Sequence, residues 1–267
     1  MGETMKFLEE VSEQGVTERR FDLEVEGQRV PGIVWTPTGA QGPRPLLLQG
    51  HGGIQHKRVE NVLALARRMV RNHGWAVAAI DAPTHGDRIT KEQAERARER
   101  TVEAVRSGRA TTGRPPSDEQ RQAMAKAARS AVAEWKATLD ALQGLDEIGS
   151  QGPVAYWGVS MGTRYGVPLI ASDPRITCAV LGLFGIGPDP DEFSEAAGRI
   201  EIPLLFLFQL NDELMTPASG LALFSTFGSK IKTMHINPGG HVGVPQFERD
   251  EYEAFYMRHI GKAAAPG

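Results

Sequence analysis

The residue best suited to chemistry is Ser160, which stands between two glycines in the sequence GVSMG at 158–162. An apolar run at 153–157 precedes it and predicts a buried strand, and helical spacing follows over 161–172. In a G-x-S-x-G turn between strand and helix, the tight backbone projects the serine hydroxyl above the sheet, where it can act as a nucleophile. The alternative interpretation is an ordinary strand-to-helix turn. The remaining residues must distinguish the two.

A serine hydroxyl is a weak nucleophile, so it needs a base and an acid that orients the base. Among the seven histidines, His241 follows the last predicted strand in the glycine-rich sequence NPGGHVGVP, where a side chain can turn toward the strand ends. His235 lies inside that strand, so we expect it to pack or to point at a helix. His73 and His259 lie in predicted helices and are expected at the surface. A surface loop position is also the alternative for His241.

The candidate acid is Asp212, directly after the strongly apolar strand predicted at 203–210. A carboxylate there would meet His241 at the carboxyl edge of a parallel sheet, which is the edge where such sheets bind ligands. Its alternative role is a turn residue or the N-cap of the helix predicted at 217–228. Three other acids lie nearby in the sequence and are less favoured: Glu213, which should point elsewhere, Asp189 and Asp191.

Short apolar runs alternate with amphipathic helices along the chain, which is typical of βαβ units and a mostly parallel sheet. The order Ser160, Asp212, His241 matches that of α/β hydrolases, and the chain resembles this superfamily from about residue 20 to 260. The resemblance implies an α/β-hydrolase fold: a mostly parallel central sheet of about eight strands, helices on both faces, and a helical insertion after the fourth strand.

The resemblance also interprets QGHGG at 49–53 as a loop that supplies an oxyanion hole. Gly53 would donate one backbone N–H, and Met161, the residue after the nucleophile, would donate the other. Two fixed donors would match the negative charge that develops on a carbonyl oxygen during acyl transfer. The alternative is a glycine-rich connection that requires positive φ.

The segment DAPTHGDR at 81–88 resembles the D-x-x-G-H-G segment of many family members. Thr84 replaces the usual first glycine. We expect Asp81 and His85 to order the loop beneath the site rather than to catalyse.

We expect residues 1–267 to form a single domain, with 88–127 as a helical insertion. This insertion carries ten basic and six acidic side chains, a net +4, whereas the rest of the chain carries −7. A solvated helical excursion is one interpretation, and a lid over the site is the other, because long insertions are often functional. The positive excess weakly suggests anionic substrates. Two capping-box pairs open its helices, Thr90 with Gln93 and Ser117 with Gln120.

The composition, 40% hydrophobic and 24% charged over 267 residues, is that of a globular protein. A net charge of −3 offers no reason to expect nucleic acid or an anionic membrane as partner. No apolar run approaches the ~20 residues that cross a bilayer, and the N-terminus lacks the pattern of a secretory signal. The single cysteine, Cys178, is expected as a buried thiol. We therefore expect a cytoplasmic protein with a small-molecule ester as partner, and we leave a homodimer open.

The sequence predicts neither a metal nor an organic cofactor. His51 and His56 lack the H-E-x-x-H spacing of a zinc helix. With one cysteine in the chain, thiolate-rich metal sites are excluded.

The expected function is that of a serine hydrolase that cleaves a carboxylic ester or thioester through an acyl-enzyme. Within the superfamily, the chain looks closest to intracellular carboxylesterases and the dienelactone-hydrolase-like group, although Ser160 departs from the cysteine that dienelactone hydrolases typically use. The alternatives on the same three residues are a lactonase, a C–C bond hydrolase, an acyltransferase or a cofactor-free haloperoxidase. A ligand receptor without turnover is the less favoured alternative.

Overall fold

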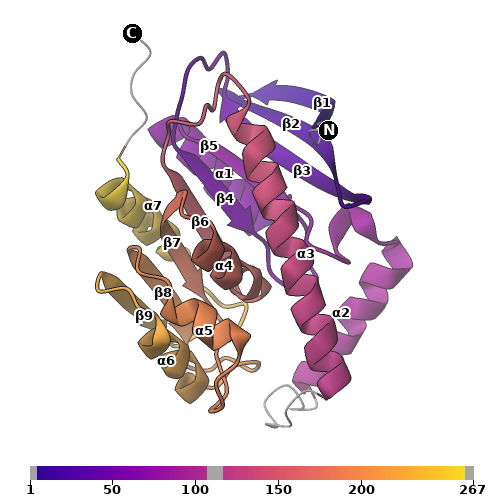
Figure 1. Ribbon diagram of the computed structural model, residues 1–267, viewed down its shortest axis with the longest axis vertical. Coiled ribbons are helices and arrows are strands. Elements are labelled where there is room, and N and C mark those ends of the chain that lie inside the picture. Colours follow the sequence, from indigo (N-terminus) through magenta and orange to yellow (C-terminus); the bar gives the residue numbers. More distant parts are fainter. Residues whose placement is uncertain (1–4, 107–116, 262–267) are drawn as a thin grey trace.

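The computed structural model describes residues 5–106 and 117–261, and it is built around one nine-stranded sheet (Figure 1). The strands lie in the order β1-β2-β3-β5-β4-β6-β7-β8-β9. The first three, with β5, pair antiparallel, and every pairing from β5 through β4 to β9 is parallel. The strands are β1 (Lys6–Glu13), β2 (Val16–Val25), β3 (Gln28–Pro37), β4 (Leu46–Gly50), β5 (Ala76–Ile80), β6 (Val154–Val159), β7 (Ile176–Gly182), β8 (Leu204–Gln209) and β9 (Lys232–Asn237).

The sheet confirms the expected α/β-hydrolase architecture but has nine strands where we expected about eight. The unexpected strand is β1, which forms one edge of the sheet and pairs only with β2. All eight of its residues are exposed, so no buried face marks it in the sequence. As a result, the insertion follows the fifth strand of the chain rather than the fourth.

Each face of the sheet has its own hydrophobic core, because successive strand residues point to opposite faces. On β4, for example, Leu46 and Leu48 enter one core, and Leu47 enters the other. The first core lies under α3, α4, α5 and α6, which Figure 1 shows in front of the sheet. The second lies under α1 and α7, behind it. The helices are α1 (Glu60–His73), α2 (Lys91–Arg106), α3 (Asp118–Gln143), α4 (Met161–Ser172), α5 (Glu192–Gly198), α6 (Pro217–Thr226) and α7 (Glu248–His259).

The described part of the insertion consists mainly of helix α2 and the first turns of helix α3. Both capping boxes are present, with reciprocal hydrogen bonds between Thr90 and Gln93 and between Ser117 and Gln120. The helix that begins after Ser117 does not end before the core helix expected at 128–143; the two are one helix, α3. Part of the segment that could act as a lid, 107–116, lies outside the described residues, and the lid stays a prediction.

Candidate active site

Four non-glycine residues with positive φ follow the carboxyl ends of four parallel strands. They are Ile54 after β4 (φ 55°), Thr84 after β5 (63°), Ser160 after β6 (57°) and Leu183 after β7 (52°). β-branched and bulky residues rarely adopt this conformation, and backbone strain of this kind clusters at functional sites. Strained backbone is therefore concentrated at this edge of the sheet, where the sequence predicts the site.

Ser160 occupies the sharp turn between β6 and α4. Its backbone, at φ 57° and ψ −118°, belongs to neither element. Its N–H donates to the carbonyl of Gly182 on β7, at 2.8 Å. The hydroxyl of Thr163 braces the same corner, lying 2.6 Å from the Gly182 carbonyl and 2.9 Å from the Gly158 carbonyl. The serine is thus held by the neighbouring strand, and Thr163 is a support that the sequence analysis missed.

The glycines around Ser160 are required by close backbone approach. A Cβ on Gly162 would lie 2.3 Å from the carbonyl oxygen of Gly50, and one on Gly158 would lie 2.8 Å from the backbone of Gly162. Neither distance is compatible with a side chain. The buried hydroxyl of Tyr156 fills the space between the two segments and donates to the Gly162 carbonyl at 2.8 Å. These contacts bring the end of β4, with the loop that follows it, against the start of α4.

His241 bridges the other two predicted residues. Its Nε2 lies 2.9 Å from Ser160 Oγ, and its Nδ1 lies 2.7 Å from Asp212 Oδ2. If Nδ1 carries the proton, it donates to Asp212 while Nε2 accepts from the serine hydroxyl. The other carboxylate oxygen, Asp212 Oδ1, accepts the N–H groups of Leu214 and Met215 at 2.8 and 2.9 Å. The buried carboxylate is therefore fixed in position by the turn that follows β8.

The loop after β4 carries Gly53, whose N–H makes no hydrogen bond within the described ranges. Met161 opens α4, so its N–H also has no partner within the helix. The buried ring of His51 supports this loop: its Nε2 accepts the N–H of Ala82 at 3.0 Å, and its Nδ1 lies 2.8 Å from the Gly52 carbonyl. Burial lowers the pKa of His51 to about 4. The imidazole is neutral, as its acceptor role at Nε2 requires.

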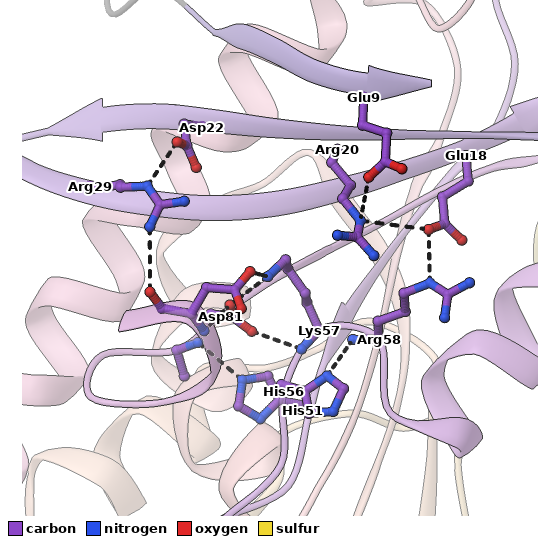
Figure 2. A network of polar contacts seen from close by, with 12 residues as sticks. Glu9, Glu18, Arg20, Asp22, Arg29, His51, His56, Lys57, Arg58 and Asp81 are labelled. Atoms are coloured by element: carbon purple, nitrogen blue, oxygen red, sulfur yellow. Dashed lines mark hydrogen bonds and ion pairs between the residues drawn. The ribbon is translucent and has the colours of Figure 1, made fainter. Parts of the chain in front are cut away.

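Asp81 organises the loop after β5, as Figure 2 shows. Its carboxylate binds Lys57 Nζ at 2.6 Å and accepts the N–H groups of Lys57 and Asp87 at 2.9 and 2.8 Å. A Cβ on Gly86 would lie 2.1 Å from the same carboxylate. Lys57 also binds Asp87, and this holds the pKa of Asp87 below its usual value. Asp81 thus has the structural role that we expected.

Four of the other acids and histidines considered in the sequence have no hydrogen bond to the residues of the candidate site among the described residues, and one does. Asp191 caps α5, a short helix that the sequence analysis did not predict, and Asp189 is exposed. His235 binds the buried Glu248 at the start of α7, at 3.0 Å. His73 is not the exposed residue expected, because it binds Glu253 of α7 at 2.8 Å and its side chain is 11% exposed. The exception is Glu213, which does not point away: it binds the backbone of His241.

Three further features bear on the sequence predictions. In the described part of the chain, no group of three or more His, Cys, Asp or Glu side chains could hold a metal ion. No helix among the described residues is long and apolar enough to span a membrane. Cys178 is buried, and burial raises the pKa of its thiol to about 12. The cytoplasmic location and the homodimer left open stay predictions.

The nine-stranded, mostly parallel sheet with helices on both faces is that of the α/β-hydrolase class. A solved structure of a cold-adapted esterase from an Arctic intertidal metagenomic library is 33% identical to this chain, covering 96% of it and 99% of the esterase, with a TM-score of 0.77. The chain belongs to the esterases of the α/β-hydrolase superfamily.

More distant structures share the fold. An acetyl xylan esterase from Paenibacillus sp. R4 is 16% identical over 96% of this chain and 88% of its own, with a TM-score of 0.69. An esterase from Pyrococcus furiosus is 14% identical over 91% and 93%, with a TM-score of 0.62. A scan of family models and a search of curated proteins both give no match.

Proposed function

We propose that this protein is a serine carboxylesterase that works through an acyl-enzyme. The observation that carries the proposal is the continuous chain of contacts from Asp212 through His241 to Ser160, at 2.7 and 2.9 Å. A serine in an ordinary turn would need neither the positive φ nor the histidine at its hydroxyl. The comparison with solved structures adds support, because a relative that is 33% identical to this chain is an esterase.

In the proposed reaction, Ser160 Oγ attacks the acyl carbon of the ester while His241 Nε2 takes the hydroxyl proton. Asp212 stabilises the imidazolium that forms and keeps the ring in orientation. His241 then gives the proton to the leaving alcohol as the C–O bond of the ester breaks. A water molecule, deprotonated by His241, attacks the acyl-enzyme, and the acid leaves as Ser160 recovers its proton.

Negative charge on the carbonyl oxygen would be held by the N–H groups of Gly53 and Met161. Within the described ranges neither N–H group donates to a backbone carbonyl. The close approach of Gly162 to Gly50 supports the proposal that the Gly53 and Met161 N–H groups are neighbours. The positive end of the α4 dipole favours the same charge. Losing one such donor typically costs ~2.7–4 kcal/mol of transition-state stabilisation.

The same three residues could serve a thioesterase, a lactonase, a C–C bond hydrolase, an acyltransferase or a cofactor-free haloperoxidase, and a receptor without turnover is a further alternative. We favour ester hydrolysis because the 33% identical relative is an esterase. Serine in place of cysteine at 160 separates the chain from the typical dienelactone hydrolase pattern. Small-molecule esters are therefore the substrates to test first.

The experiment is hydrolysis of p-nitrophenyl esters from acetate to octanoate by the wild-type protein and by Ser160→Ala. We expect steady turnover that falls at least about 10³-fold in the variant, because attack requires the hydroxyl. Equal rates in the two proteins, together with no labelling of the wild type by a fluorophosphonate, would overturn the proposal. If turnover is lost in Ser160→Ala as expected, the chain-length profile of the wild type reports the depth of the acyl pocket.

A further inference from the structure

Two consecutive carboxylates contact the same histidine. Asp212 binds the side chain of His241 at Nδ1, at 2.7 Å. Glu213 binds its main chain, because Glu213 Oε2 accepts the His241 N–H at 2.8 Å. The imidazole is thus oriented by one carboxylate while the backbone that carries it is held by the next.

The glycine before His241 makes the second contact geometrically feasible. A Cβ on Gly240 would lie 2.5 Å from Glu213 Oε1 and 3.0 Å from the carboxyl carbon. Gly240 is not among the described residues with positive φ, so its backbone conformation does not require glycine. The missing side chain instead leaves room for the Glu213 carboxylate against the loop.

The end of β8 and the turn after it hold the rest of this loop in a similar way. Asn211 Nδ2 donates to the Pro238 carbonyl at 2.6 Å, and its N–H donates to the Gly239 carbonyl at 3.2 Å. Gln209 Nε2 donates to the Gly240 carbonyl at 3.1 Å. These bonds fix carbonyl groups before His241, whereas the bond from Glu213 fixes the histidine's own N–H.

We propose that Glu213 is a positioning residue that sets the distance between His241 and Ser160 through the main chain. The proposal rests on the function proposed above for these residues. Among the described residues, Glu213 makes no hydrogen bond to the imidazole or to the Ser160 hydroxyl, so it acts through the main chain of the histidine. A small displacement of a catalytic group can cost up to about 10²-fold in rate. The distance at stake is the 2.9 Å between His241 Nε2 and Ser160 Oγ.

The first test compares Glu213→Ala with Glu213→Gln in ester hydrolysis. The alanine variant loses the acceptor, and we expect kcat to fall about tenfold with KM within about twofold, because the base and not the substrate pocket is displaced. The glutamine variant keeps an amide oxygen that can accept the same N–H. It should recover most of the lost kcat. Thermal unfolding of all variants, with Glu201→Ala as an exposed control at the other end of β8, checks that the fold is intact.

The second test is Gly240→Ala, alone and combined with Glu213→Ala. The added methyl group would displace the Glu213 carboxylate, so the single variant should lower kcat to a similar extent. Because both changes break one contact, their effects should not add in the double variant. Full additivity would mean that Gly240 and Glu213 act separately and would overturn the proposal.

Two other results would overturn it. Glu213→Ala with wild-type kcat would show that the main-chain contact does not position His241. An equal loss in the alanine and glutamine variants would show that charge, not the accepted hydrogen bond, is responsible. Ser160→Ala separates these results from failure of the proposed function: if the serine chemistry is correct, this variant is inactive whatever Glu213 does.

Discussion

At the scale of single residues, His51 shows how burial fixes a charge state that the loop needs. Its ring is 2% exposed, and its Nε2 accepts the N–H of Ala82. Protonation of His51 at Nε2 would break this hydrogen bond, because the new Nε2–H would face the N–H of Ala82. The loop that carries Gly53 therefore depends on a neutral histidine, and a pKa of about 4 supplies it above that pH.

His51 should make the free energy of unfolding depend on pH in a defined window. The unfolded chain binds this proton below about pH 6.5 and the folded chain only below about pH 4, so stability should fall as the pH drops through this interval. Each unit of pKa depression is worth about 1.4 kcal/mol. Urea denaturation at several pH values gives the free energy of unfolding at each pH. Plotted against pH, this free energy should change less steeply for His51→Asn than for the wild type. Parallel curves would contradict the prediction, since the carboxylates contribute equally to both proteins.

An ion pair links the loop after β5 to helix α3. Arg88, which ends the short 3₁₀ turn Gly86–Arg88, binds both oxygens of Glu134 at 2.7 and 2.8 Å. The two side chains are only 12% and 3% exposed. The insertion begins at Arg88 and leads back to the sheet through α3, which carries Glu134. The ion pair therefore holds the start of the insertion against the helix that follows it.

Removing one member of this pair should be more costly than removing both. Glu134→Ala leaves a poorly solvated guanidinium, and we expect a loss of about 3 kcal/mol in the free energy of unfolding. The double change Arg88→Met with Glu134→Leu should recover much of that loss. Urea denaturation of the single and double variants measures the difference. A double variant at least as unstable as Glu134→Ala would count against it.

The two hydrophobic cores share one sheet and should unfold together. Trp135 lies in the core under α3, whereas Trp35, Trp75 and Trp157 lie in the core under α1 and α7. In Trp135→Phe, tryptophan fluorescence therefore reports on the second core alone, while far-UV circular dichroism reports on both. We expect the two urea transitions to coincide, as for a single cooperative unit. Two separated midpoints would instead indicate two domains.

The elements that the sequence predicts well are those whose side chains enter a core. Strands β4 and β6 are buried along their whole length, and this produces the apolar runs that reveal them. Strand β1 has no such run, since pairing with β2 and not burial holds it in place. Helix α5 has only seven residues, too few to establish a period.

The same distinction applies to the candidate site. Ser160, Asp212 and His241 could be predicted because each occupies a recognisable position after a strand. Glu213 and Thr163 could not, since both act on backbone atoms far away in the sequence. Which carbonyl or N–H lies within reach is decided only when the sheet has formed.

The two halves of the site differ in what holds them, and this should decide how heat inactivates the protein. The serine corner is tied to the buried strand β7 through the Gly182 carbonyl. The histidine sits in a loop beside the exposed Val242, held by the exposed Glu213. Local opening requires the least free energy where backbone bonds are exposed. On warming, we expect His241 to separate from Ser160 before the sheet melts, so the temperature limit of the proposed activity would be set by one loop.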